Sequence, residues 1–539
     1  MSALALNVSA MPSTDFDAAD LPSGTPASRF FRYVRGSAAE DGHLFPRDGA
    51  SIPLRLLIDA STLPLDLLND TDFVDAINRP EVEPYLCWLK ADRDTESVRL
   101  WRDAIREFAS TEIGFADLES CSRMGDSVSF RAKTTFAQGS TMSIRSANFF
   151  PVYQQLDEHA HPDAEITMAD RIRTAVFAAS AKSMEAHALV TGMKTVGRVG
   201  VGENDLLALC SPDDAIGLVG HYLRMTGSRH FKITEGGRRS YTLKTLKGFY
   251  STCVEVNSPM AHLLNFAAAH VLQDQAVADG TFTIIARLER AARAVDELLR
   301  FMSRISPGRL DDDTAEEIAE AFDRELLYIS AVLDSCGRMF AACIGTEVAS
   351  KGRYSLQSRA TFTKIVDPHY GDSPLLVRLH ELQPMMHFAH ELRNKIHDTT
   401  LQSVHSYSRA YGSSRSATIT LDLLPHTVAD ALELGIYVPQ SDFPFAKDQA
   451  VVADLPTLGT VLLRRAMEFV NTFLFMIASE KPTAAPNAAK VLGAMAAGDD
   501  QALTVGKAPA LIGRLFGWDV PQPFKTSVVP LHASLARQI

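Results

Sequence analysis

The stretch ELRNKIHD, residues 391–398, places a permanent cation and a titratable imidazole four residues apart. Arg393 and His397 are separated by about one helical turn, so both side chains can project from one face of a helix. A guanidinium neutralises a phosphate, and an imidazole transfers a proton near neutral pH. The pair therefore supplies the two groups, a cation and a proton-transferring side chain, that cleavage of a phosphodiester without a metal requires at minimum.

Other polar residues lie on the same or neighbouring rows of this predicted helix. His390 falls beside the pair, and Asn394 can orient a phosphate or an imidazole through its amide. Glu391 or Asp398 can fix the tautomer of a histidine. Asp334, on the preceding predicted helix, is a candidate to reach the same cleft.

Two alternative interpretations of this helix stay open at the level of sequence. In the first, Arg393 is exposed and His397 is favoured by the dipole at the end of a helix. In the second, His387, His390 and Glu391 meet a metal ion. The chain has no HExxH motif and no second helix with a matching ExxH pair. We therefore predict no metal site and no cofactor.

Composition sets the outer limits on function. The chain has 539 residues, enough for two to four domains, and its 46% hydrophobic and 22% charged content is ordinary for a globular protein. Its 65 acidic and 53 basic side chains give a formal net charge of -12. This charge argues against a general nucleic-acid coat or a polybasic membrane binder, but it is compatible with a local cationic pocket.

Targeting signals and cysteine usage predict a location. No cationic segment followed by an apolar core opens the chain, and no apolar run approaches the roughly 20 residues needed to cross a bilayer. The six cysteines include no CxxC pair, which favours reduced thiols. These features predict a cytoplasmic protein without a membrane segment.

The sequence predicts a mainly α, multidomain fold. Residues 1–48 are rich in Ser, Pro, Gly and Ala and predict a flexible tail. A small α+β unit follows, in which Pro53 confines the first strand to a sheet edge or to a strand start. We place the boundaries at 1–48 (tail), 49–155 (α+β domain), 156–305 (helical middle domain), 306–480 (helical domain) and 481–539 (C-terminal extension).

Within these limits, periodicity and turn residues predict individual elements. Helices are expected over 96–112, 212–225, 314–349, 374–404 and 458–479, with Pro384 marking a kink or the true start of the fourth. A hairpin is expected over 127–149. A helix, two glycines at 236–237 and a strand at 240–244 with basic flanks resemble a winged helix, or else form a solvated basic loop.

The segment 314–480 resembles the HEPN superfamily, because a long helix and a variable loop precede the run 392–397. The resemblance implies a helical domain, often dimeric, that cleaves RNA without a metal. His397 would act as general acid and base on the ribose 2′-hydroxyl and the leaving oxygen, and Arg393 would stabilise the charged phosphorane. In the family, four to six residues lie between the arginine and the histidine. Here only three residues lie between Arg393 and His397, and Asp398 occupies the first position at which the family's spacing would place a histidine.

The function predicted from these observations is metal-independent RNA cleavage in a bacterial defence or stress system, by a homodimer formed through the HEPN-like helices. The catalytic residues would be Arg393, Asn394 and His397, supported by His390, Asp398, Glu391 and Asp334. A non-catalytic HEPN-like scaffold or protein-interaction module is the first alternative. The second is a nucleic-acid-binding regulator that uses residues 205–250.

Overall fold

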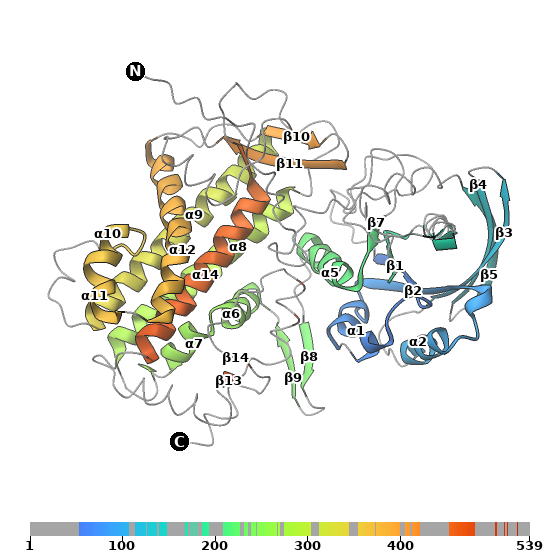
Figure 1. Ribbon diagram of the computed structural model, residues 1–539, viewed down its shortest axis with the longest axis horizontal. Helices are drawn as coiled ribbons and strands as arrows, with labels where there is room; N and C mark the ends of the chain where they lie inside the picture. Colours follow the sequence, from blue (N-terminus) through green and yellow to red (C-terminus); the bar gives the residue numbers. More distant parts are fainter. Residues whose placement is uncertain are drawn as a thin grey trace.

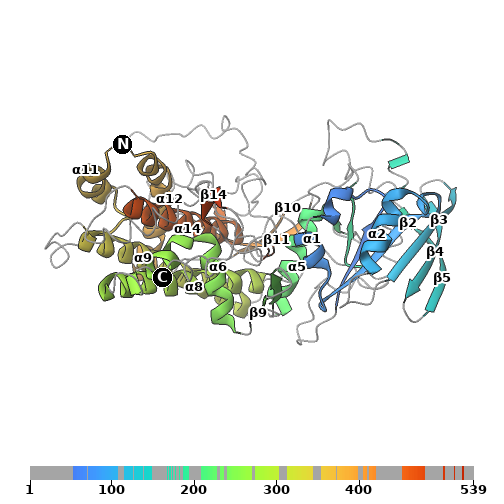
Figure 2. The same cartoon turned by 90° about the horizontal axis from the view of Figure 1, so that it is seen from below.

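The computed structural model describes a mixed sheet and a larger helical part, with helix α5 (Pro212–Thr226) between them (Figure 1 and Figure 2). Apart from single positions elsewhere, the described residues are 53–69, 71–106, 114–124, 127–136, 139–147, 186–192, 208–226, 231–235, 239–243, 245–266, 274–302, 312–343, 354–371, 373–398, 405–409, 412–420 and 452–479. The predicted tail and nearly all of the predicted extension 481–539 lie outside these ranges. The protein is mainly helical, as the sequence predicts.

The sheet has seven strands in the order β5-β4-β3-β2-β1-β6-β7. Neighbouring strands from β3 to β7 in that order pair in parallel, whereas β4 and β5 extend the β3 edge as antiparallel strands. Across the parallel strands the direction of chain progress reverses between β1 and β6. The strands are β1 (Leu54–Asp59), β2 (Val82–Leu89), β3 (Gly114–Met124), β4 (Ser127–Phe136), β5 (Gly139–Ala147), β6 (Ala188–Val190) and β7 (Ala208–Cys210).

Strand β1 lies in the middle of the sheet, paired with β2 on one side and β6 on the other. Four of the six residues in its sequence LRLLID are apolar and all except Arg55 are buried, which is typical of a parallel strand covered on both faces. Pro53 precedes the strand, so the prediction of a strand start is confirmed and the alternative of a sheet edge is wrong. The predicted hairpin is confirmed by the pairing of β4 with β5.

Two strands of this sheet lie beyond position 155, where the sequence places a helical domain. β6 and β7 contain only three residues each, too few for a periodic pattern to be recognised. β6 is fully buried and pairs with β1, and β7 pairs with β6. The α/β part therefore extends to α5, and helices α1 (Thr71–Ile77) and α2 (Glu96–Arg106) belong to it.

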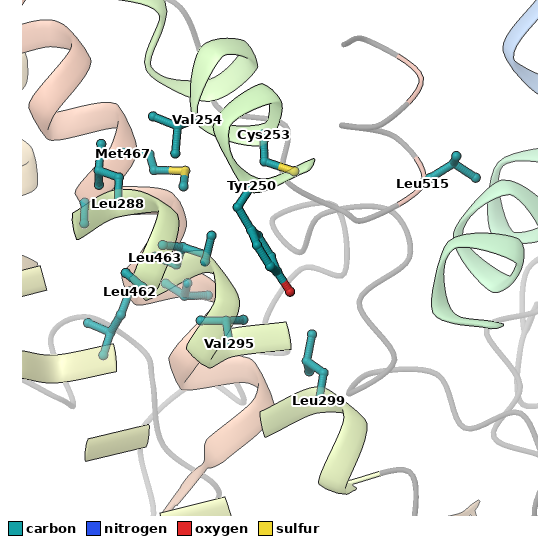
Figure 3. Packing of buried hydrophobic residues seen from close by; sticks show 14 of the residues in the cluster. Tyr250, Cys253, Val254, Leu288, Val295, Leu299, Leu462, Leu463, Met467 and Leu515 are labelled. Carbon is teal, nitrogen blue, oxygen red and sulfur yellow. The ribbon is translucent and has the colours of Figure 1, made fainter. Parts of the chain in front are cut away.

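The helical part is built around four long helices that pack against one another. They are α8 (Gln275–Met302), α9 (Asp312–Cys343), α12 (Pro374–Asp398) and α14 (Leu455–Ser479). Their apolar faces, together with α6 (Leu246–Asn257) and α7 (Pro259–Phe266), bury one hydrophobic core. Figure 3 shows Tyr250 from α6, Leu288 and Val295 from α8, and Met467 from α14 meeting in this core.

The bundle crosses the predicted boundary at 305/306, because α8 packs along α9. The predicted long helices are present with shifted ends, and Pro384 lies inside α12 instead of at its start. A glycine allows one close approach: a Cβ on Gly337 of α9 would lie 2.0 Å from the carbonyl oxygen of Tyr354. Among the described residues, no helix is long and apolar enough to cross a bilayer.

Shorter elements connect or flank the long helices. The predicted strand 240–244 is confirmed as β9 (Arg239–Leu243), which pairs with β8 (Phe231–Glu235) between α5 and α6. The winged-helix interpretation stays a prediction. The other elements are α10 (Arg359–Thr361), a π-helical turn (Phe362–Val366), α11 (Asp367–Tyr370), β10 (His405–Arg409), β11 (Gly412–Thr420), β12 (Val452–Asp454), β13 (Ala502–Leu503), β14 (Lys525–Thr526), and the 3-10 turns Leu65–Leu68 and Lys90–Asp92.

Candidate functional site

The candidate residues lie in the last turns of α12. Pro374 opens this helix at a position where the missing N–H costs no hydrogen bond, and the Leu375 amide donates to the Ser373 hydroxyl at 3.1 Å. Apolar side chains such as Leu382 and Met386 bury one face of the helix in the bundle core. The polar residues of the final turns therefore lie at the margin of that core.

Arg393 is half-buried, and its Nη1 donates to the side-chain oxygen of Asn394 at 3.2 Å. Its Nε is buried and has no hydrogen-bond partner among the described residues. Arg393 also forms no ion pair within the described part of the chain. Within the described residues, the Arg393 guanidinium thus lies beside Asn394 and its charge is not neutralised by an ion pair.

His390 is half-buried one turn before Asn394. Burial is the main cause that lowers the pKa of His390 from its ordinary value, and the charges of Arg393 and His387 lower it further. Glu391 and Asp334 act in the opposite direction. The imidazole is therefore mostly neutral at neutral pH, the state in which it can accept a proton.

Asp334 comes from α9, which packs against α12. Its carboxylate is close enough to raise the pKa of both His390 on α12 and Arg287 on α8. The structure therefore brings Asp334 into the neighbourhood of the α12 candidates. The Nδ1 atoms of His387 and His390 are buried and have no hydrogen-bond partner among the described residues.

His397 and Asp398 are the last two residues of α12. Their side chains lie outside the described part of the chain. The predicted role of His397 as the proton-transferring group, and the supporting role of Asp398, stay predictions.

Three further arginines, which the pattern around residues 391–398 does not predict, lie on the neighbouring helices. Arg287 of α8 donates from Nη1 to the Ala331 carbonyl at 2.5 Å and to the Ser335 hydroxyl at 3.0 Å. Arg338 of α9 donates to the same Ser335 hydroxyl at 3.1 Å. Arg290 lies with its guanidinium carbon 5.8 Å from the ring centre of Tyr328. We call Arg287, Arg290 and Arg338 the arginine cluster.

The arginine cluster is short of compensating charge. Among the residues that the structure describes, none of its three members forms an ion pair. Burial lowers the pKa of Arg287, the charges of Arg338 and Arg290 lower it further, and Asp334 opposes them. The i, i+3 spacing of Arg287 and Arg290 was visible in the sequence, but nothing local indicated that Arg338 would share a hydroxyl with Arg287.

A second group of charged residues lies at the carboxyl ends of the parallel strands. Asp59, the last residue of β1, is fully buried, with its Oδ2 3.8 Å from Nε of Arg173. Its carboxylate accepts hydrogen bonds from the hydroxyls of Ser61 and Thr62, the latter at 2.9 Å. Arg173 also contacts Asp92, which follows β2, at 2.6 Å. We call Asp59, Asp92 and Arg173 the strand-end cluster.

The strand-end cluster lies beside the point where strand order reverses, between β1 and β6. Open α/β sheets often bind ligands there. However, hydrogen bonds join the two strand ends directly. Thr62 Oγ1 lies 2.9 Å from Thr191 Oγ1 and accepts from the Gly192 amide at 3.1 Å. A Cβ on Gly192 would lie 2.3 Å from the carbonyl oxygen of Thr62. This reversal point is filled by the protein's own groups.

Comparisons with known proteins do not assign a family. No family model matches the chain, and neither a curated protein nor a solved structure matches it. Within the described residues, no three His, Cys, Asp or Glu side chains are grouped so that they could hold a metal ion.

Proposed function

We propose that the helical part is a HEPN-like bundle that cleaves RNA without a metal ion, in a bacterial defence or stress setting. The observation that carries the proposal is the Arg393 guanidinium, which Asn394 orients and no ion pair neutralises among the described residues. His390, lowered in pKa by burial, lies one turn away. A retained positive charge beside neutral imidazole suits a substrate whose charge is on phosphate.

In the proposed reaction, His397 removes the proton of the ribose 2′-hydroxyl, and the 2′-oxygen attacks the neighbouring phosphorus. The bond from phosphorus to the 5′-oxygen breaks, and that oxygen receives a proton from an imidazole. The products are a 2′,3′-cyclic phosphate and a 5′-hydroxyl end. Arg393 stabilises the extra negative charge on the phosphorane, and Asn394 keeps its guanidinium in place.

The test is cleavage of a labelled single-stranded RNA by the full chain with a chelator present. We expect His397→Ala to lower the cleavage rate by about 100-fold or more, the usual contribution of a general acid or base. His380→Ala is a matched control, because His380 lies exposed on the same helix and contacts Asp367 at 2.9 Å. Equal rates in His397→Ala and in the unmodified protein would refute the proposed role.

A non-catalytic scaffold is the competing proposal, and the motif spacing favours it, because Asp398 occupies the position nearest to the family's active histidine. Both proposals include a homodimer formed through the bundle helices. Sedimentation velocity distinguishes dimer from monomer. A dimer that cleaves no RNA, and in which His397→Ala changes nothing, would establish the scaffold instead of the nuclease.

A further inference from the structure

The arginine cluster concentrates positive charge on a protein whose formal net charge is -12. Arg290 and Arg338 are exposed, and Arg287 of α8 is half-buried against α9. Two other arginines of these helices have a carboxylate partner: Arg293 contacts Glu297 at 2.9 Å, and Arg324 contacts Glu297 at 2.7 Å. Among the described residues, the arginine cluster gathers three arginines without an ion pair at one place on α8 and α9.

The geometry keeps two like charges close together. Arg287 and Arg338 both donate to one neutral acceptor, the Ser335 hydroxyl, so their guanidinium groups are neighbours. Like charges at this separation repel, and a hydroxyl does not cancel either charge. Among the described residues, the carboxylates that interact with the arginine cluster are Asp334, which acts on Arg287, and Glu289, on which Arg290 acts. Two carboxylates therefore oppose three guanidinium groups there.

We propose that the arginine cluster binds the phosphate backbone of an RNA strand that continues from the cleavage site on α12. An RNA backbone presents one negative charge per nucleotide, so successive phosphates can meet cations on successive helices. Helix α9 packs against both α8 and α12, and its Asp334 acts on Arg287 of α8 and on His390 of α12. The bidentate guanidinium of arginine suits phosphate oxygens.

This inference rests on the proposed function for its choice of RNA, but binding can be measured apart from cleavage. We would use a fluorescein-labelled 2′-O-methyl oligouridylate, which lacks the attacking hydroxyl, and follow anisotropy with the full chain at several salt concentrations. Arg290→Gln and Arg338→Gln remove exposed charges. Arg287 is left unchanged, because it also holds the Ala331 carbonyl.

We expect the Arg290→Gln, Arg338→Gln double variant to bind the oligonucleotide roughly tenfold more weakly or worse. The slope of log affinity against log salt concentration should also become shallower by about 1.4, which is roughly 0.7 for each lost phosphate contact. Arg293→Gln, a change of the same charge on the exposed face of α8, should leave both quantities unchanged. A double variant that binds like Arg293→Gln would overturn the inference.

Two further outcomes separate the inference from the reaction. Arginine-dependent binding without cleavage of ordinary RNA would support the binding site and refute the nuclease. Cleavage of ordinary RNA together with binding that does not depend on the arginines would support the nuclease and refute the binding site. An inorganic polyphosphate of matched charge that binds as tightly as the oligonucleotide would overturn RNA as the ligand.

Discussion

The strand-end cluster and the arginine cluster both contain arginine beside buried or half-buried groups, but their charges are balanced differently. Arg173 lies between two carboxylates, and the Asp59 carboxylate also accepts hydrogen bonds from two hydroxyls. Arg287 and Arg338 share one hydroxyl and have no ion pair among the described residues. Among the described residues, the first cluster has partners of opposite charge in ion pairs, and the second does not.

This difference separates a structural role from a functional one. Burial raises the pKa of Asp59, and the charge of Arg173 and the hydrogen bonds from Ser61 and Thr62 oppose this shift, as a buried carboxylate requires. Folding alone therefore accounts for the strand-end cluster. Uncompensated like charges on neighbouring helices oppose folding, so their presence is better explained by an anionic ligand. The group of charges that folding alone does not explain therefore lies in the helical bundle.

The largest expected effect comes from removing the cation of the strand-end cluster. Arg173→Gln leaves Asp59 buried without its charge partner, which should lower the free energy of unfolding of the α/β part by about 3–5 kcal/mol. Chemical denaturation followed by tryptophan fluorescence measures this change, because Trp88 and Trp101 are buried in that part.

The matched control is the partly exposed ion pair of Arg55 with Glu83, at 2.8 Å in the same sheet. Glu83→Gln should cost no more than about 1 kcal/mol, because water screens a pair of this exposure. If Arg173→Gln were as mild as Glu83→Gln, the strand-end cluster would not be a structural device, and a ligand role at that strand end would have to be tested.

The sequence predicted helices and the hairpin better than it predicted the sheet. Long periodic segments such as α9 and α12 carry many residues of one pattern, and the hairpin has its own turn residues. β6 and β7 have three residues each, too few for a local pattern. The register of β6 depends on its pairing with β1, more than 120 residues away, and β7 in turn pairs with β6.

The candidate site was predictable where it lies on one helix and unpredictable where it joins several. The α12 residues follow from helical spacing, and Asp334 was selected because it is a polar position on the preceding helix. The Arg287–Ser335–Arg338 contact depends on which faces of α8 and α9 meet. The burial that lowers the pKa of His390 is likewise a tertiary property.

Glu325 on α9 is a buried carboxyl group that lacks the cation and the hydrogen bonds of Asp59 among the described residues. Its side chain is fully buried, and neither carboxylate oxygen has a hydrogen-bond partner among the described residues. A Cβ on Gly459 of α14 would lie 2.7 Å from its Oε2, so this glycine leaves the carboxyl its space. Burial raises the pKa of Glu325 well above its ordinary value.

The sign of the resulting pH dependence follows from this shift. Above the ordinary carboxyl pKa the unfolded chain loses the proton while the folded chain keeps it, so stability falls as pH rises towards the raised pKa. The slope from this one group is at most about 1.4 kcal/mol per pH unit. Glu325→Gln removes the titration, so the variant should gain stability relative to the unmodified protein between pH 5 and pH 8.

Denaturation followed by circular dichroism at several pH values measures this gain. Asp313→Asn, on an exposed position of the same helix, is the control and should leave the pH profile between pH 5 and pH 8 unchanged. A stability difference between Glu325→Gln and the unmodified protein that is constant with pH would show that the carboxyl is ionised in the folded state. Glu325 would then require a compensating cation, as Asp59 does.

The smallest expected effect gives the most direct contrast between the two clusters. Arg338→Gln removes one of two neighbouring like charges, so in the absence of ligand it should raise stability by about 0.3 kcal/mol at low salt, the scale of a repulsive surface pair. Arg293→Gln breaks the pair with Glu297 and should lower stability by a similar amount. In about 1 M salt both differences should vanish, because the screening length falls to about 3 Å. If Arg338→Gln destabilised the protein at every salt concentration, its bond to Ser335 would be structural, and the excess charge would no longer argue for a bound anion.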